Sequence, residues 1–158
     1  MKKLAAVLAV ALAACFASPA YAVDSFTVTA IANTESDIGS GWADAFKIIK
    51  VEWLAAANGA KATGTIPAMK GHLMVMVTDP GATAPAQNYD ITLIDQYGVD
   101  VLGGGGVNRH TTANEVAIPL AGALAIPGGR PISGPLTATF AETTNANCNG
   151  TFYLYIEK

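Results

Sequence analysis

From residue 23 onward, apolar and polar side chains alternate along several short runs of the chain. A period of two places the apolar side chains on one face of an extended strand, whereas a helix needs a period of 3.6. In the first run, Phe26, Val28 and Ala30 share one face and Thr27 and Thr29 share the other. The runs predicted as strands are 26–30, 46–53, 73–77, 91–93, 116–120, 136–140 and 152–156.

Two of these runs say more about the arrangement of the sheet. Leu73–Val77 is apolar on both faces, which predicts a central strand. In Phe46–Trp53, the first apolar residues share a face with the later ones only if a bulge lies near Ile48 and Ile49.

Turn-forming residues separate most of these runs. They are Asn58-Gly59, Asp79-Pro80-Gly81, Tyr97-Gly98, Gly103–Gly106, Pro127-Gly128-Gly129 and Asn149-Gly150. The only helical pattern after residue 22 is the short stretch Gly41–Phe46. We therefore expect an all-β fold: one domain over residues 23–158, an antiparallel β-sandwich (Ig-like or jelly-roll-like) of about seven or eight strands.

The first 22 residues have the three parts of a bacterial signal peptide. Lys2 and Lys3 precede an apolar helical run, Leu4–Ala17, which is too short to span a bilayer. Ala20 and Ala22 then match the small-residue site of signal peptidase. We expect export to the periplasm, the cell surface or the medium, with residues 1–22 removed.

An alternative processing site ends at a cysteine. Leu12-Ala13-Ala14-Cys15 resembles the lipobox of bacterial lipoproteins, and lipidation of Cys15 would anchor the protein to a membrane. Cleavage after Ala22 instead leaves Cys148 as the single cysteine. Its thiol is then either buried or paired with another molecule.

Charge is sparse, and this bears on the partners. Only 13% of the residues are charged and 51% are hydrophobic, with a formal net charge of −3. The few basic residues form no stripe that would neutralise phosphates, so nucleic-acid binding is not expected. So few charges favour a surface covered by protein partners or by self-association.

No catalytic or metal-binding pattern is present. Gly103–Gly106 lacks the Gly-Lys-Ser/Thr ending of a phosphate loop. Asp90, Asp95 and Asp100 are five residues apart, which does not match the alternate positions of a calcium loop. Asp95 instead opens a predicted type I turn in which its carboxylate accepts backbone N–H groups.

The histidines and serines also lack the expected companions. His72 and His110 are the only histidines, and neither has a zinc-ligand spacing. Ser36, Ser40 and Ser133 lie outside any nucleophile elbow. We therefore expect a protein without catalytic residues, cofactor or metal.

Two places are candidates for contact with a partner. Tyr153 and Tyr155 alternate with the apolar residues of the last strand, so they form an outward patch or else cover the second sheet of the sandwich. Arg109 and His110 follow the glycine run and are candidates for contact with an anionic partner.

The segment 88–109, with Tyr89-Asp90-Ile91-Thr92-Leu93 followed by Gly98-Val99-Asp100-Val101-Leu102-Gly103-Gly104, is similar to small all-β proteins of tailed bacteriophages and prophages. The later Gly134-Pro135-Leu136-Thr137 and the apolar last strand extend this resemblance over residues 46–156. It implies an accessory virion component rather than an enzyme. A signal peptide is a departure from that pattern, because virion proteins assemble in the cytoplasm.

The chain also resembles exported fimbrial subunits, which polymerise by lending a strand to a neighbour. Phe26-Thr27-Val28-Thr29 would be that strand, although the paired cysteines of such subunits are absent. The leading expectation is a non-catalytic structural protein of phage or prophage type. The alternative is an extracytoplasmic surface or fimbria-like subunit or binding module.

Overall fold

A computed structural model of the chain describes residues 25–31, 46–56, 62–85, 88–141 and 145–158. Within these residues the chain is all-β, and no helix is present. The strands are β1 (Ser25–Ile31), β2 (Phe46–Ala55), β3 (Thr63–Pro80), β4 (Asp90–Ile94), β5 (Glu115–Ala117), β6 (Leu120–Ala121), β7 (Leu124–Ala125), β8 (Arg130–Ala141) and β9 (Cys148–Glu157).

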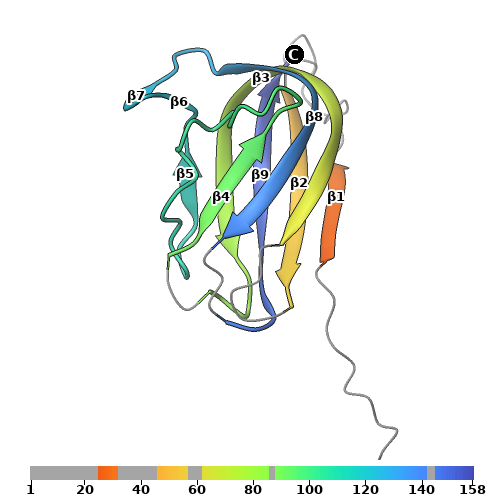
Figure 1. The fold of residues 1–158 in the computed structure, drawn as a ribbon, viewed down its shortest axis with the longest axis vertical. Helices are drawn as coiled ribbons and strands as arrows, with labels where there is room; N and C mark the ends of the chain where they lie inside the picture. The colour runs from red at the N-terminus through yellow and green to blue at the C-terminus, as the bar shows by residue number, and fades with distance from the viewer. Residues whose placement is uncertain (1–24, 32–45, 57–61, 86–87, 142–144) are drawn as a thin grey trace, which may run out of the picture.

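Seven strands form one antiparallel sheet in the order β1-β2-β9-β3-β8-β4, with β5 also paired to β3. This sheet folds over itself into two layers, because β3 is long and arches across the top of the molecule (Figure 1). Its first half pairs with β8, and its second half pairs with β9 and β5. The all-β, antiparallel prediction is confirmed.

The arch of β3 is centred on Gly71. This residue has a φ of 146°, and a Cβ atom there would collide with the backbone oxygen of Glu157. A glycine is therefore required where the strand changes partners. The first half of β3 was missed from the sequence, because Gly64, Pro67 and Gly71 interrupt the alternation.

Two details of the predicted faces differ from the structure. β2 pairs with β1 and β9 without a bulge, so Phe46 and Ile48 lie on the face opposite Ile49. In β3, the pairing register shifts between Leu73 and Val75, so these two residues lie on opposite faces. β3 is central, as predicted.

Two predicted turn or strand assignments also change. Asn149-Gly150 lies within β9 rather than in a turn, and Gly150 pairs there with Trp53 of β2, whose ring uses the space left by the absent side chain. A Cβ atom on Gly150 would lie 3.0 Å from that ring. The predicted strand 116–120 is divided between β5 and the small two-stranded sheet of β6 and β7.

An aromatic cluster joins the two layers. Trp53 of β2 stacks on Phe140 of β8, with ring centroids 4.5 Å apart. Phe152 of β9 and Phe26 of β1 lie against the same Phe140 ring, at 5.7 and 6.4 Å. Burial of this many large rings provides much of the hydrophobic stabilisation of the fold.

Candidate interaction surface

The outer side of β9 carries both tyrosines singled out from the sequence. Phe152, Leu154 and Ile156 are buried in the core, so Tyr153 and Tyr155, which alternate with them, point away from it. Of the two alternatives for these tyrosines, the outward patch is the one that agrees with the burial pattern of β9.

Pairing across the sheet extends this patch over four strands. Tyr155 lies between Ile48 of β2 and Val75 of β3. Tyr153 lies between Lys50 and Val77, and Val77 in turn pairs with Val116 of β5. We call this surface the tyrosine face; it comprises Ile48, Lys50, Val75, Val77, Val116, Tyr153 and Tyr155.

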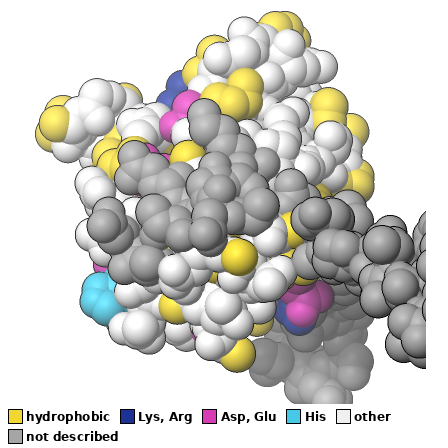
Figure 2. All heavy atoms as spheres, turned by 60° about the horizontal axis from the view of Figure 1, so that its bottom comes forward, with side chains coloured by type: hydrophobic (Ala, Val, Ile, Leu, Met, Phe, Trp, Pro, Cys, Tyr) yellow, Lys and Arg dark blue, Asp and Glu magenta, His cyan; other side chains and the backbone are white. Residues whose placement is uncertain are grey.

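The tyrosine face is mostly apolar at its β5 side. Val116 is 61% exposed, and Ile118 and Leu124 beyond it are exposed as well. β6 and β7 project from the upper left of the molecule (Figure 1), and hydrophobic side chains lie at the end of this projection (Figure 2). Figure 2 also shows few charged side chains on the described surface, in agreement with the low charge of the sequence.

Lys50, the cation of the tyrosine face, forms an ion pair with Glu52 of its own strand. The Lys50 ammonium donates a hydrogen bond of 2.8 Å to Glu52, and this hydrogen bond raises the pKa of Lys50. Both side chains are solvent-exposed enough for the pair to contribute little to stability.

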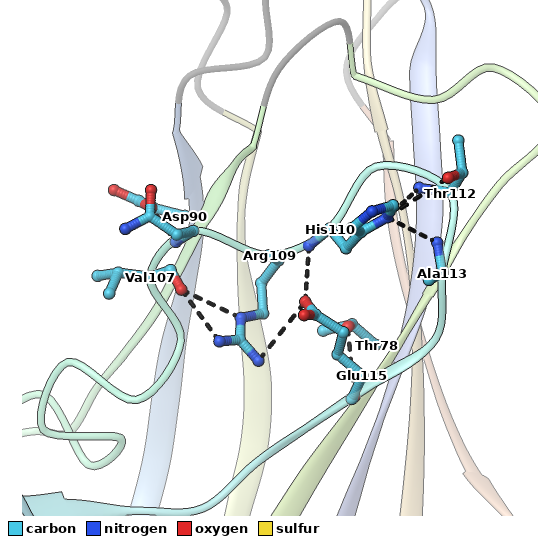
Figure 3. A network of polar contacts seen from close by, with 9 residues as sticks. Thr78, Asp90, Val107, Arg109, His110, Thr112, Ala113 and Glu115 are labelled. Atoms are coloured by element: carbon cyan, nitrogen blue, oxygen red, sulfur yellow. Dashed lines mark hydrogen bonds and ion pairs between the residues drawn. The ribbon is translucent and has the colours of Figure 1, made fainter.

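Arg109 and His110 belong to one polar network in the connection between β4 and β5 (Figure 3). The Arg109 guanidinium donates to the carbonyl oxygen of Val107 and lies 3.8 Å from a carboxylate oxygen of Glu115. Its side chain is only 15% exposed. The geometry therefore makes Arg109 a support of its own loop rather than a surface cation.

His110 is exposed but is also engaged in this network. Its Nδ1 atom accepts the backbone N–H groups of Thr112 and Ala113, at 3.1 and 3.0 Å. Its own backbone N–H donates to the Glu115 carboxylate (Figure 3). The imidazole thus caps a turn, and sequence reasoning had not identified Glu115 as the residue that connects it with Arg109.

The three regularly spaced aspartates all accept backbone N–H groups. Asp95 Oδ1 accepts those of Tyr97 and Val99, both at 2.9 Å, which confirms the predicted turn. Asp100 accepts N–H groups on both of its oxygens, and Asp90 accepts that of Asn108. Each carboxylate therefore stabilises the long connection between β4 and β5.

The glycine run packs closely against neighbouring backbone. A Cβ atom on Gly103 would collide with the carbonyl oxygen of Leu120, and one on Gly106 with that of Ile91. Val101 and Leu102, just before the run, are buried in the core. In the motif behind the phage resemblance, Val101 and Leu102 therefore fill part of the core and the glycines pack against backbone. The motif does not form a phosphate-binding loop.

Beside this loop, Tyr89 is 0% exposed, and burial raises its pKa to about 12. The Thr78 hydroxyl and the nearby Arg109 guanidinium act in the opposite direction, lowering the pKa. A neutral tyrosine is thus favoured at this position across the physiological pH range.

Of the remaining sequence candidates, His72 on β3 and Ser133 on β8 lie near each other on paired strands, and both line one hollow together with Asp95. No hydrogen bond is found among the His72, Asp95 and Ser133 side chains in the part of the chain that the structure describes. Cys148 is buried on β9, where another molecule cannot reach its thiol without local opening. Cys15, Ala20, Ala22, Ser36, Ser40 and most of 41–46 lie outside the described residues.

Among the residues that the structure describes, no group of three or more His, Cys, Asp or Glu side chains is placed to hold a metal ion. No helix in that part of the chain is long and apolar enough to cross a membrane. A scan against protein-family models found no match, and a search of curated proteins found none either. The function is therefore inferred from the surfaces described above.

Proposed function

We propose that this protein is a non-catalytic structural or interaction protein that acts through the tyrosine face. The fold we propose for it is an exported β-sandwich of Ig-like or jelly-roll-like type, the two layers being the two sheets. The observation that supports a contact role is the alignment of Tyr153 and Tyr155 with outward apolar residues of three other strands.

Physical chemistry favours a protein partner for such a surface. Tyrosine provides a large apolar ring with a polar end and loses little side-chain entropy on binding, and it is enriched in the cores of protein interfaces. A largely apolar patch on the face of a β-sheet is in addition a hazard for aggregation unless it is covered in use.

Self-association or partner binding can be tested with one pair of variants. Replacing Tyr153 and Tyr155 together by Ser should reduce association, measured by light scattering after size-exclusion chromatography, and leave thermal unfolding nearly unchanged. The matched control is Thr137→Ser with Thr139→Ser on β8, which does not border the tyrosine face, and it should have no effect. A wild-type chain that stays monomeric at high concentration, and captures no virion or envelope protein, would refute a contact role for this face.

The leading role we propose is an accessory component of phage or prophage particles, on the strength of the resemblance of residues 88–109 and 134–137. The test is mass spectrometry of particles purified after prophage induction in the bacterium that carries the gene. Peptides from residues 46–158 should copurify with the particles. Their recovery only from the periplasm or medium would favour the alternative instead.

The alternative is an extracytoplasmic surface or fimbria-like subunit, and one observation favours it. β1 forms the outer edge of the sheet and pairs only with β2 among the described strands, so it is the strand most easily exchanged between subunits. Deleting residues 23–33 should then abolish polymers, and polymers that persist without this segment would exclude such exchange.

A further inference from the structure

The hairpin formed by β6 and β7 presents apolar side chains to solvent. Residues 116–129 contain no side chain that is charged or that can form a hydrogen bond. Within this stretch Leu124 is 74% exposed and Ile118 is 44% exposed. Among the described strands, β6 and β7 contact only each other. We call residues 118–126 the apolar hairpin.

The apolar hairpin is nevertheless held in one conformation. Its two strands pair with each other, and Gly122, with a φ of 65°, occupies the turn position that favours glycine. At the base of the hairpin, the backbone N–H group of Leu120 donates to the carbonyl oxygen of Leu102 at 2.9 Å. The Arg130 guanidinium donates to the carbonyl oxygen of Leu120 at 3.3 Å. An element that is already ordered loses little entropy when it binds a partner.

A lipid bilayer is a poor match for this hairpin. β6 and β7 each have one edge without a partner strand among the described residues, and unpaired backbone N–H and C=O groups are costly in hydrocarbon. Residues 116–129 also contain no lysine or arginine that would contact anionic headgroups. A protein surface is the better match, because it offers apolar contact together with hydrogen-bonding groups.

The same molecule carries a hollow of about 660 Å³ where β3 arches. Its lining is mainly apolar, with Ile132 of β8 buried and the side chain of Tyr97, after β4, 78% exposed. The Gln96 side chain donates to the carbonyl oxygen of Ser133 at 3.3 Å, which fixes the wall that carries Tyr97 to β8. The hollow is therefore a preformed apolar site with room for a few side chains.

The charges around the hollow are balanced. Lys70, Lys158 and Asp95 line it, and Glu157 lies opposite His72 in the pairing of β3 with β9. Such a set of charges favours neither an anion nor a cation. The group that fits the hollow best is an uncharged apolar side chain, and the apolar hairpin presents one in Leu124.

We propose that the apolar hairpin of one copy of this chain inserts Leu124 into the hollow of a second copy. The two surfaces match in chemistry, since both are apolar and neither carries a net charge. No residue of the hairpin lines the hollow of its own chain, and the hairpin projects from the side of the molecule, away from the arch of β3 (Figure 1).

This contact joins two different surfaces of the same protein, so it is heterologous. It forms a closed ring if the rotation from copy to copy closes, and a filament if it does not. It uses no residue of the tyrosine face, and so it goes beyond the role proposed for that face and does not depend on it.

The test removes each half of the contact separately. Leu124→Lys places a charge on the hairpin, and Ser133→Arg fills the hollow with a long charged side chain. Both are made in a parent chain with Tyr153→Ser and Tyr155→Ser, so that association through the tyrosine face is not measured. In sedimentation equilibrium the parent should associate in the micromolar to millimolar range, and each variant should weaken association about tenfold or more.

A mixture of the two variants distinguishes this contact from other kinds of association. It contains one intact hairpin, on the Ser133→Arg copy, and one intact hollow, on the Leu124→Lys copy. The mixture should therefore form dimers about as tightly as the parent associates, and nothing larger. The two altered surfaces carry the same sign of charge and do not attract each other.

Val107→Lys is the matched control, because Val107 is an exposed apolar residue of the connection between β4 and β5. It should leave association unchanged, and thermal unfolding of all the variants should match the parent, since the replaced side chains are exposed. A parent that stays monomeric at millimolar concentration, a mixture that forms no dimers, or equal weakening by the control would overturn the proposal. Binding of the parent to phosphatidylcholine vesicles that Leu124→Lys abolishes would also overturn it, in favour of a membrane contact.

Discussion

At the scale of single residues, Asp100 accepts three backbone N–H groups from separate parts of the chain. Its Oδ1 atom accepts those of Leu93 and Leu102, both at 3.1 Å, and its Oδ2 atom accepts that of Gly104 at 2.9 Å. One carboxylate thus connects β4, the buried residue Leu102 and the glycine run. Loss of a charged acceptor leaves such donors without partners, which is costly where they are partly buried.

We predict that Asp100→Ala lowers the free energy of unfolding by about 2–3 kcal/mol. Asp100→Asn should cost less, because one acceptor oxygen remains. The measurement is urea unfolding, with Asp95→Ala as the control, since Asp95 serves a more exposed turn and should cost about 1 kcal/mol. Equal losses for the two alanine variants would contradict this assignment.

Tyr89 gives a prediction for alkaline pH. In the unfolded chain its hydroxyl ionises near pH 10, whereas in the fold burial raises its pKa to about 12. Between these values the unfolded state gains stability by losing a proton that the folded state retains. The free energy of unfolding should therefore fall as the pH rises from about 10 to about 12.

Tyr89→Phe removes the ionisable group and isolates this contribution. The difference in urea-unfolding free energy between the wild type and Tyr89→Phe should be constant below about pH 9 and should change progressively above pH 10. A difference that is flat over the whole range would show that Tyr89 does not hold its proton in the fold.

At the scale of elements, the Phe26 ring of β1 packs over Gly64 and so helps to hold β1 against the rest of the fold. The Phe26 ring occupies the space where a Gly64 side chain would be, and it also packs against Phe140. Phe26 and Val28 both pack on the core from β1. The absent side chain at Gly64 is therefore what allows β1 to approach the first half of β3.

We predict that Gly64→Ala lowers the free energy of unfolding by about 1–3 kcal/mol, because the added methyl group meets the Phe26 ring. In a Phe26→Ala background the same change should cost about 1 kcal/mol less, since the ring is gone. Urea unfolding of the four chains gives this coupling. Gly64→Ala combined with Val28→Ala is the control, and these two should be additive.

The sequence indicated most of the strands because their alternation reports which face is buried. It did not indicate the first half of β3, where Pro67 lies in a register shift between Ile66 and Met69 and Gly71 lies at the arch. The sequence also placed Gly150 in a turn, because a glycine after an asparagine is typical of turns. The structure requires a glycine there because of the Trp53 ring on another strand, and no local pattern reports such a contact.

The candidate surfaces, like the strands, were indicated only in part by the sequence. Alternation within one strand placed Tyr153 and Tyr155 opposite the apolar residues of that strand, but it left open whether they form an outward patch or cover a second sheet. The partners that extend this face, such as Val75 and Val116, depend on strand order and on a register shift in β3, which no local pattern specifies. A hollow beside Tyr97 is lined by parts of β3 and β8, by the turn after β4 and by Lys158. The sequence did not indicate it, because these four segments lie far apart along the chain.

At the scale of the whole molecule, the surfaces with different chemistry lie apart. The Arg109 network is at one end of β4, the hollow is beyond its other end, and the tyrosine face covers the outer side of the larger layer. A contact at the tyrosine face therefore does not need to involve the residues at either end of β4.

The export that we propose leads to the last prediction, which concerns the mature N-terminus. When the full chain is produced in a bacterium, intact-mass spectrometry should show a product that begins at Val23, because Ala20 and Ala22 fit signal peptidase. Cys15→Ser should leave this mass unchanged, whereas replacing Ala20 and Ala22 by Lys should block processing. A product that begins at a lipid-modified Cys15 would instead mean that the domain is anchored to a membrane, with the tyrosine face held near the cell surface.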